Sequence, residues 1–548
     1  MLIKWKRRLE VTETQKKLLE LTEEIAKICD ENGIVYYLAG GSTIGVLRHR
    51  GFIPWDDDMD IMMTRDNWVK FLAATRDSMP PGRELMCQEN SRDYNNMFGR
   101  YVDTTSTTIH RGDILGGGAA GFVIDILCLD PIPDEKAYHK YIEDLMLYSD
   151  LINPMLNYST RWMVNENRYE EYLERIRKEG RDAVLRELEA AMFSYDEDSC
   201  DYLVLRWGGV PFLFDKKMYG ESRWGEFEGR SFRIMDRASD YLVQHYGDEW
   251  AYIPPHDEQL THDAIFSPEI GYESIMTDYL SAIDVTAEKD FFFNEKKNFF
   301  RNMKAAAEEL NASRELLARI AAQALEIKLK KSGADVMQLL TEKKYEEILQ
   351  LFAEYIGEQG SRDLIGREDF PGIDRFNTPT LIDIREDYFY AVIVSMINSN
   401  RMSKAMRFLD VWEFNQGTLS QRLEDQRAFV LEIRRAISEY DVGNVLWALD
   451  ETERLYKEHP DNKSLNMLLV TILARLERYE ELKAVLDECV KKYPDDGYIM
   501  KYLGDYYRYD GRTELAHRTY EEALRKTNNG MTMLEIGELA ETDEQFKR

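Results

Sequence analysis

The sequence predicts an α/β (α+β) domain, with a small mixed sheet flanked by helices, followed by an all-α solenoid. In the N-terminal half, helical patterns alternate with short apolar runs bounded by glycine turns, as in a sheet with covering helices. Further along, the pattern is helical and a 34-residue repeat appears. A chain of 548 residues allows about two to four domains. We expect a mixed domain at 1–285, a helical connector at 286–340 and a repeat domain at 341–548.

The N-terminal elements follow from periodicity and turn residues. The first patterns predict a helix, a buried strand, a glycine turn, a short helix and an acidic strand: 12–32, 34–39, 40–42, 43–48 and 58–63. The next patterns predict a helix, two strands, a helical region and a further helix: 66–79, 98–102, 122–127, 133–191 and 236–246. This order describes an α/β module in which the glycine turn comes shortly before the acids.

The C-terminal repeat is marked by Pro460 and Pro494, which lie 34 positions apart and each end a helical pattern. The last unit places small or apolar residues at matching positions: Leu503, Gly504, Tyr507, Ala516, Tyr520 and Ala523. The positions 34 earlier are all apolar: Leu469, Val470, Leu473, Leu482, Leu486 and Cys489. One unit further back Ala448 and Leu455 fit, whereas Thr452 breaks the row. The region resembles tetratricopeptide repeats, whose helix pairs stack into an α-solenoid.

Composition excludes several kinds of partner. The chain has 71 Lys and Arg against 101 Asp and Glu, a net charge of −30, which argues against nucleic acid and against anionic membrane surfaces. The five cysteines are scattered, so we expect neither a zinc site nor a disulfide framework. There is no signal peptide and no apolar run long enough for a transmembrane segment, so a cytoplasmic protein is expected.

The segment 39–62 carries the chemistry and reads AGGSTIGVLRHRGFIPWDDDMDIM. Gly41 and Ser42 follow a strand and open a helix, an arrangement that can bind phosphate, although most such turns are only turns. On a strand, Asp58 and Asp60 would point to one side while Met59 and Ile61 enter the core. The alternative for the acidic run is a solvated turn.

A third acid, Asp125, interrupts the apolar strand Phe122-Val123-Ile124-Asp125-Ile126-Leu127. A charge in a buried strand is costly unless it is paired or binds a metal. Asp58, Asp60 and Asp125 are therefore the candidate catalytic residues and ligands of Mg²⁺ or Mn²⁺, which prefer oxygen donors and substrate phosphates. Asp56 and Asp57 are expected to support these ligands rather than to bind the metal directly.

Four cationic side chains are candidates for substrate binding. Arg48, His49 and Arg50 lie between the glycine turn and the acids, where they can hold a pyrophosphate, and Arg100 lies on the strand at 98–102. A solvated basic turn is the alternative. We do not adopt His49 as a general base, and Trp55 is expected to pack rather than to stack on a nucleobase.

The glycine-serine turn, the two spaced acids and the later acid match the nucleotidyltransferase arrangement. More closely, residues 41–60 resemble the signature of the LicD/fukutin family of phosphotransferases. Other similar pieces follow in order: Arg100 with Asp103-Thr104-Thr105, the strand around Asp125, Phe227-Glu228-Gly229, Asp240-Tyr241-Leu242, Tyr246-Gly247-Asp248 and Pro254-Pro255. The resemblance covers roughly 20–265, and its first motif is highly specific.

The resemblance implies a transferase that moves a phosphorylated alcohol, such as phosphocholine or ribitol phosphate, from a CDP-linked alcohol donor. The acceptor would be a sugar hydroxyl of a cell-surface glycan, a lipid-linked glycan, a teichoic acid or a lipopolysaccharide precursor. Asp125 would complete the metal shell or accept the hydroxyl proton. A choline group would call for an aromatic cage, for which four side chains are available: Trp207, Trp224, Tyr219 and Tyr246.

Two other functions remain open at the level of the sequence. The same acids would serve a nucleotidyltransferase acting on a small molecule, RNA or protein, although the acidic charge weakens the RNA version. A non-catalytic repeat scaffold is the second alternative, and the intact acids argue against it. The repeat domain is expected to bind a protein partner or the polymeric acceptor, or to act as a structural cap.

Overall fold

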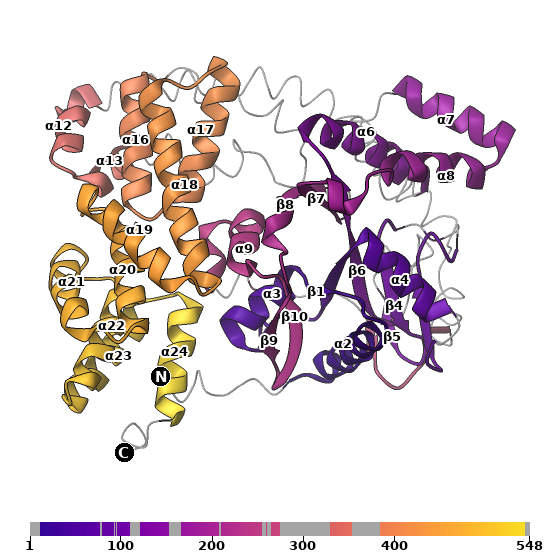
Figure 1. Cartoon of the computed structure of the whole chain (residues 1–548), viewed down its shortest axis with the longest axis horizontal. Helices are drawn as coiled ribbons and strands as arrows, with labels where there is room; N and C mark the ends of the chain where they lie inside the picture. Colours follow the sequence, from indigo (N-terminus) through magenta and orange to yellow (C-terminus); the bar gives the residue numbers. More distant parts are fainter. Residues whose placement is uncertain are drawn as a thin grey trace.

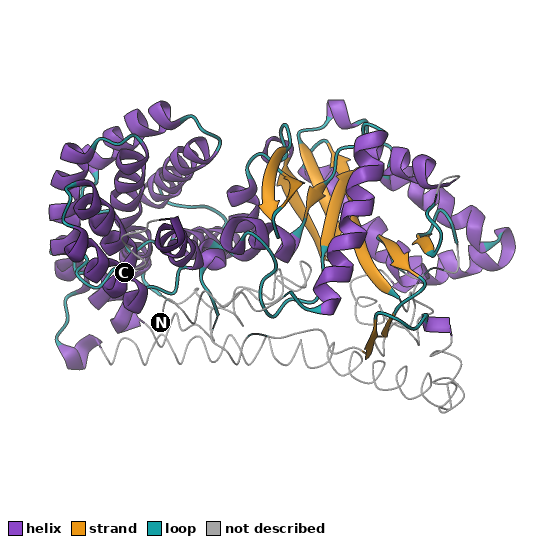
Figure 2. Cartoon of the chain, turned by 90° about the horizontal axis from the view of Figure 1, so that it is seen from below, coloured by secondary structure: helices purple, strands orange, loops and turns teal. Residues whose placement is uncertain are grey.

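The computed structural model describes residues 11–542 except 77–78, 92–93, 95, 110–120, 153–165, 208–209, 255–258, 260–264, 274–328 and 353–383. Figure 1 shows two parts side by side, one built around a sheet and one of helices alone. Figure 2 shows the same division from below, with the strands gathered in one half of the molecule. The predicted mixed sheet with helices and the helical character of the C-terminal part are confirmed.

The main sheet has seven strands arranged around β6, which is the longest at 11 residues. Its strands are β1 (Tyr37–Leu38), β2 (Asp60–Thr64), β3 (Arg83–Met86), β4 (Gly99–Asp103), β6 (Phe122–Ile132), β7 (Tyr202–Trp207) and β8 (Val210–Asp215). β2 pairs with β6 in parallel, whereas β4 and β7 pair with opposite halves of β6 in antiparallel register. The order along one path is β1-β2-β6-β4-β3, and β8 extends the sheet through β7.

Helices cover both faces of this sheet (Figure 1). α2 (Glu13–Glu31) begins with a capping box between Thr12 and Gln15, and its buried face packs on β6 beside α4 (Arg65–Arg76). The side nearer the C-terminal helices carries α3 (Gly40–Ile44), the π-helix η1 (Gly45–His49) and α9 (Ala238–Tyr246). Met59 and Ile61 are buried, and the sulfur of Met59 accepts a hydrogen bond from Thr22 of α2.

The remaining elements of this part surround the sheet. Three helices form a separate apolar cluster with the end of β6: α6 (Glu135–Ile152), α7 (Glu166–Glu179) and α8 (Arg181–Met192). Two short antiparallel pairs join β9 (Arg223–Phe227) to β10 (Arg230–Ile234) and β5 (Thr107–Ile109) to β11 (Ile265–Ser267). Three 3₁₀ turns complete the part: η2 (Glu197–Ser199), η3 (Lys216–Met218) and η4 (Asp248–Ala251).

The C-terminal part is a run of helices in which each helix from α16 to α23 packs on the next. Its helices are α12 (Val336–Thr341), α13 (Tyr345–Phe352), α16 (Glu386–Asn398), α17 (Met402–Gln416), α18 (Gln421–Asp441), α19 (Val445–Glu458), α20 (Lys463–Arg475), α21 (Tyr479–Lys492), α22 (Gly497–Tyr509), α23 (Thr513–Lys526) and α24 (Gly530–Thr542). The starts of α19, α21 and α23 are 34 residues apart, as are those of α20 and α22. Thr452, the polar residue in the apolar row, is fully buried and its hydroxyl has no hydrogen-bond partner.

Several predicted boundaries were wrong. The strand expected at 34–39 is reduced to Tyr37–Leu38, and the acidic strand begins at Asp60, so Asp58 lies in the preceding loop. The loop is held away from the sheet because Gln15 Nε2 donates to the carbonyl of Asp56 at 2.8 Å. The helix expected at 43–48 already begins at Gly40. The connector expected at 286–340 lies outside the described residues up to 328.

The two parts share a contact surface formed by α9, η4 and η1 on one side and the C-terminal helices on the other. Arg237 bonds to Ser438 and pairs with Glu439 at 3.0 Å, and the Ser438 hydroxyl donates to Asp240 at 2.5 Å. Asp248 accepts from the backbone of Ser403. Additional contacts link Ile253 to Asn528, Tyr252 to Asn529 and Arg50 to Glu538. Within the described residues, no helix combines the length and apolar character that crossing a membrane requires.

Candidate active site

Two of the three acids predicted to act together, Asp60 and Asp125, are neighbours on the sheet. Asp60 opens β2 and stands directly beside Asp125 in the parallel register with β6. Only 6% of Asp60 is exposed, and its pKa is raised well above the ordinary value, first by burial and then by Asp58, Asp125 and Asp56. An ionised Asp60 is therefore costly unless a cation lies beside it. Asp58 contributes to this crowding although it precedes the strand.

Arg100 lies on the other side of Asp125, at the matching position of β4. Its Nε donates to Asp125 Oδ1 at 2.9 Å, and both side chains are largely buried. The guanidinium also lies 5.5 Å from the ring centre of Phe98. The cation predicted to bind phosphate thus contacts the third acid, and it fixes the position of that carboxylate beside Asp60.

The glycine turn is tied to the acidic strand. The backbone N–H of Gly40, which has a φ of 49°, donates to the hydroxyl of Tyr241 at 3.0 Å. A Cβ on Gly41 would lie 2.8 Å from Asp56 Oδ2, so no side chain fits there without moving Asp56. The hydroxyl of Ser42 accepts from the backbone N–H of Asp60 at 3.2 Å. The turn therefore positions Asp56 and the start of β2.

The side chain of Arg48 is bound to other protein groups and does not face an open site. The side chain is 4% exposed, and its Nη1 donates to the carbonyls of Trp250 and Tyr252, each at 2.8 Å. Burial lowers the pKa of Arg48 to about 10, while Asp56 opposes that shift. Its Nε donates to His49 Nε2 at 3.0 Å. Arg48 thus connects η1 to the turn η4.

His49 and Arg50 differ sharply in environment. Burial and the charge of Arg48 lower the pKa of His49 to about 3, so the imidazole is neutral near pH 7. The ring of Trp55 meets it edge-on at 6.4 Å and packs against the core, as predicted for a packing residue. Arg50 is exposed and pairs with Glu226 at 3.3 Å and with Glu538 at 2.8 Å. The three basic residues therefore bind different protein groups and do not converge on one point.

Two tyrosines and one hairpin contribute to the site in ways that the sequence did not predict. Tyr241 holds Gly40, and the pKa of Tyr246 is raised well above its ordinary value by burial, by Tyr241 and by the nearby aspartates, including Asp60. The hairpin turn at Glu228 and Gly229 has positive φ at both residues. Glu228 binds the loop after η1 through its backbone N–H and its carboxylate. The only sequence signal for these roles was the resemblance of their motifs.

Of the four aromatic residues considered for a choline cage, the three whose side chains the structure describes do not gather. Tyr219 is buried in the core between Tyr37 and Phe214. Trp224 is exposed on the β9–β10 hairpin, where Arg233 lies 4.5 Å from its ring centre. The side chain of Trp207 is outside the described residues. Of the four, Tyr246 is the one whose electrostatic environment includes the acids.

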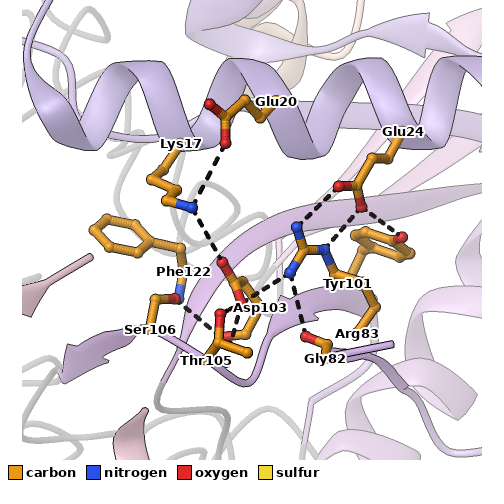
Figure 3. Close-up of polar contacts among 10 residues, drawn as sticks. All are labelled: Lys17, Glu20, Glu24, Gly82, Arg83, Tyr101, Asp103, Thr105, Ser106 and Phe122. Atoms are coloured by element: carbon orange, nitrogen blue, oxygen red, sulfur yellow. Dashed lines mark hydrogen bonds and ion pairs between the residues drawn. The ribbon is translucent and has the colours of Figure 1, made fainter. Parts of the chain in front are cut away.

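A network of polar side chains lies on the face of β4 opposite to Arg100 and joins α2, β3 and β4 (Figure 3). Asp103 is fully buried, pairs with Arg83 Nη1 at 2.8 Å and accepts from the backbone and hydroxyl of Thr105. Arg83 also binds Glu24 of α2 through two hydrogen bonds of 2.8 Å, and Tyr101 donates to the same carboxylate. Charge-assisted, bidentate contacts of this kind are among the strongest that side chains form. They fix α2 to β3 and β4 behind the acid cluster.

A divalent cation fits the chemistry of the acid cluster. Among the described residues, no three His, Cys, Asp or Glu side chains already surround a single point. Mg²⁺, however, commonly takes one or two protein carboxylates and fills its shell with water and substrate phosphate. The raised pKa of buried Asp60, crowded by Asp58 and Asp125, marks the place where positive charge would be most stabilising.

Comparison with known proteins adds to this geometry. Residues 33–111 match the family model of the LicD/FKTN/FKRP nucleotidyltransferase domain. The lipopolysaccharide cholinephosphotransferase LicD of Haemophilus influenzae is 28% identical over 284 residues, which cover 47% of this chain and 97% of that protein. Uncharacterized proteins of Rickettsia typhi and Rickettsia prowazekii are 33% and 39% identical over 54 and 52 residues. Those matches cover 10% of this chain in each case, and 18% and 20% of the two proteins.

The matched segment contains Asp58, Asp60 and Arg100, whereas Asp125 lies beyond its end and joins it through strand pairing. The similarity and the geometry thus point to the same corner of the sheet. Residues 33–111 thus match a LicD/FKTN/FKRP nucleotidyltransferase domain, and the N-terminal half of the chain is similar to a LicD protein.

Proposed function

We propose that this protein is a metal-dependent phosphotransferase that moves a phosphorylated alcohol, of the phosphocholine, ribitol phosphate or glycerol phosphate type, from a CDP-activated donor. The acceptor is a hydroxyl of a cell-surface glycan, a teichoic acid or a lipopolysaccharide precursor, and the reaction takes place in the cytoplasm. The observation that carries the proposal is the buried Asp60, flanked by Asp58 and Asp125. The similarity to a cholinephosphotransferase along 97% of that protein's length supports the choice of reaction.

The three acids would have different roles, which follow from their positions. Asp58 and Asp60 would hold Mg²⁺ or Mn²⁺, which when bound would neutralise the pyrophosphate of the donor. Asp125, which Arg100 orients, would complete the metal shell or accept the proton of the acceptor hydroxyl. The hydroxyl oxygen attacks the phosphorus that carries the alcohol, the bond from that phosphorus to CMP breaks, and CMP leaves. Ser42 and Gly41 keep the start of β2 and Asp56 in position.

We also infer that the C-terminal helices are of the tetratricopeptide type. The 34-residue spacing of α19, α21 and α23 supports this, as does the left-handed residue before each of them: Gly443, Glu477 and Gly511. Buried residues recur at the same interval, as at Thr452, Leu486 and Tyr520. Helix repeats of this kind build extended binding surfaces.

The proposal is tested by thermal stabilisation of the purified chain with CDP-choline, CDP-ribitol and CTP, each with and without Mg²⁺. We expect metal-dependent stabilisation by at least one CDP-alcohol. In Asp60→Asn this response and turnover should be lost, while the protein stays folded. The variant should also melt a few degrees higher in metal-free buffer, about 1 kcal/mol, because a buried carboxylate crowded by other acids is removed.

Asp198→Asn is the matched control, since Asp198 is exposed on η2 and outside the acid cluster. It should respond to donor and metal like the wild type. Release of CMP identifies transfer of the alcohol phosphate, whereas release of pyrophosphate would identify a nucleotidyltransferase instead. The proposal would be refuted if none of the cytidine nucleotides stabilised the protein in a metal-dependent way, or if Asp60→Asn kept near-normal turnover.

A further inference from the structure

The C-terminal helices enclose a groove of about 810 Å³ that is separate from the acid cluster. Its walls are the end of α18, the facing sides of α20 and α22, the start of α21, and α24. This volume is within the range of sites that hold organic ligands. The groove is open to solvent.

Tyrosines are the aromatic residues of the lining. Four of them reach the groove: Tyr440, Tyr479, Tyr502 and Tyr509. Tyr479 and Tyr509 stack with ring centres 3.8 Å apart and an angle of 14° between their planes, and 60% of Tyr509 is exposed. Such rings offer an apolar face together with a polar edge. They suit a ligand that presents C–H faces and hydroxyl groups side by side.

The charges of the groove balance one another. Three cations, Arg475, Lys501 and Arg508, stand among three carboxylates: Asp505, Glu535 and Glu538. Lys501 pairs with Glu535 at 2.5 Å and with Asp505 at 3.0 Å, and Arg475 lies over the ring of Tyr440. No excess of either sign is present among these side chains to attract a polyanion or a basic peptide.

Aliphatic side chains contribute little to the lining. Among the described residues, Ala474 and Leu539 are the aliphatic ones that reach the groove. An acyl chain or the apolar anchors of a peptide helix would find no hydrophobic cleft there. The groove instead combines the exposed ring of Tyr509 with partly buried tyrosines, many hydrogen-bonding groups and no net charge, a surface that suits a neutral sugar chain.

The groove borders the catalytic part. Glu538 of its α24 wall pairs with Arg50, directly after η1. α24 itself packs against η1, the segment that follows the glycine turn. One helix, about 10 Å thick, therefore separates the groove from the segment that leads to the acids.

We propose that this groove binds the saccharide chain of the acceptor. This inference rests on the proposed function and extends it. The sugar rings stack on Tyr509 and on its partner Tyr479, while the charged pairs hydrogen-bond their hydroxyl groups. The chain then carries its reacting end past α24 toward the acid cluster.

The test uses saturation-transfer NMR on the full chain with chitotetraose, maltotetraose and cellotetraose as probes. We expect transfer to at least one of these neutral oligosaccharides. Tyr509→Ala should weaken that binding about fivefold or more, because a stacking face is lost, whereas Tyr509→Phe should retain it. The exposed ring makes these substitutions compatible with folding, which the melting temperature verifies. Tyr195→Ala, at an exposed tyrosine outside the groove, should bind like the wild type.

The proposal is overturned if the wild type binds none of the three oligosaccharides, or if Tyr509→Ala binds them as well as the wild type does. It is also overturned if a mixed pool of acidic and basic decapeptides, and no oligosaccharide, binds in a Tyr509-dependent way. Its failure is distinct from failure of the proposed function. Oligosaccharide binding that depends on Tyr509, without any response to CDP-alcohols, would retain the sugar site and reject the transferase.

Discussion

At the scale of single residues, His49 is a titratable side chain that stays neutral near pH 7 in the folded protein. In the sequence it lies between the glycine turn and the acids, but burial and Arg48 lower its pKa to about 3. Since the folded pKa is below the ordinary 6.5, the folded state resists protonation. The associated stability is complete above pH 6.5 and is lost as the pH falls toward 3, by at most about 1.4 kcal/mol per pH unit.

We expect acidification from pH 7 to pH 5 to lower the free energy of unfolding less in His49→Gln than in the wild type, because a glutamine takes up no proton. Its amide oxygen can still accept from Arg48 Nε. Urea unfolding at both pH values measures the difference, and the pH–rate profile between pH 5 and 8 should keep its shape. Equal losses of stability in the two proteins would show that His49 takes up no proton on unfolding.

Which site residues could be predicted depends on where their partners lie in the chain. Asp58 and Asp60 stand out because acids alternate with apolar residues locally, and Asp125 stands out as a charge within an apolar strand. The partners of Arg48 are carbonyls more than 200 residues away, at Trp250 and Tyr252. No local pattern reveals these partners. The sequence therefore predicted that Arg48 binds substrate, whereas the contacts that the structure shows are with protein carbonyls.

At the scale of elements, α24 and η1 form a tight junction that should respond to added volume. Gly530 begins α24 against the stem of Arg48, and a Cβ there would come within 2.7 Å of Arg48 Cγ and 2.8 Å of Cδ. The stem cannot swing away easily, because the guanidinium is bound to two carbonyls. We expect Gly530→Val to destabilise the protein by about 1–3 kcal/mol, as measured by urea unfolding.

A double-mutant cycle separates this clash from a general effect on the helix. Arg48→Ala removes the two nearest atoms that a new side chain would meet and leaves the Ala251 carbonyl at 3.3 Å, so Gly530→Val should cost clearly less in that background than in the wild type. The coupling between the two positions is the measured quantity. Strictly additive effects would mean that the clash is relieved in another way and that the junction is looser than its geometry implies.

Among the elements, periodicity was a good guide to helices and a poor one to short strands. The predicted helices at 12–32, 66–79 and 236–246 correspond to α2, α4 and α9, since each has a clear apolar face. The hairpins β7–β8 and β9–β10 were missed, because pairing between neighbouring segments, rather than a strong apolar alternation, defines them. Asp58 was placed in a strand because nothing local reveals the bond from Gln15 to the Asp56 carbonyl.

At the scale of the whole molecule, the sequence predicted two kinds of structure but not their docking. The contacts join residues at least 155 positions apart, as between Asp248 and Ser403 or Arg50 and Glu538. They involve the ends of α9 and η1, which also hold the glycine turn and Arg48. The helical part is therefore continuous with the structure that supports the acids.

This docking predicts that the two parts unfold together. Calorimetry of the full chain should show a single transition, and Arg237→Met should broaden or split it. Arg237 is the side chain that binds both Ser438 and Glu439, and its loss leaves partly buried polar groups without their donor, at a cost of about 1–3 kcal/mol. Arg175→Met is the matched control, because the Arg175 side chain is 23% exposed, close to the 24% of Arg237, but its partners Glu179 and Glu187 are exposed and all three lie within the sheet-containing part. Its effect should be smaller and should leave the transition single. Two separate transitions in the wild type, or equal effects of the two substitutions, would mean that the helical part is tethered to the catalytic part without stabilising it.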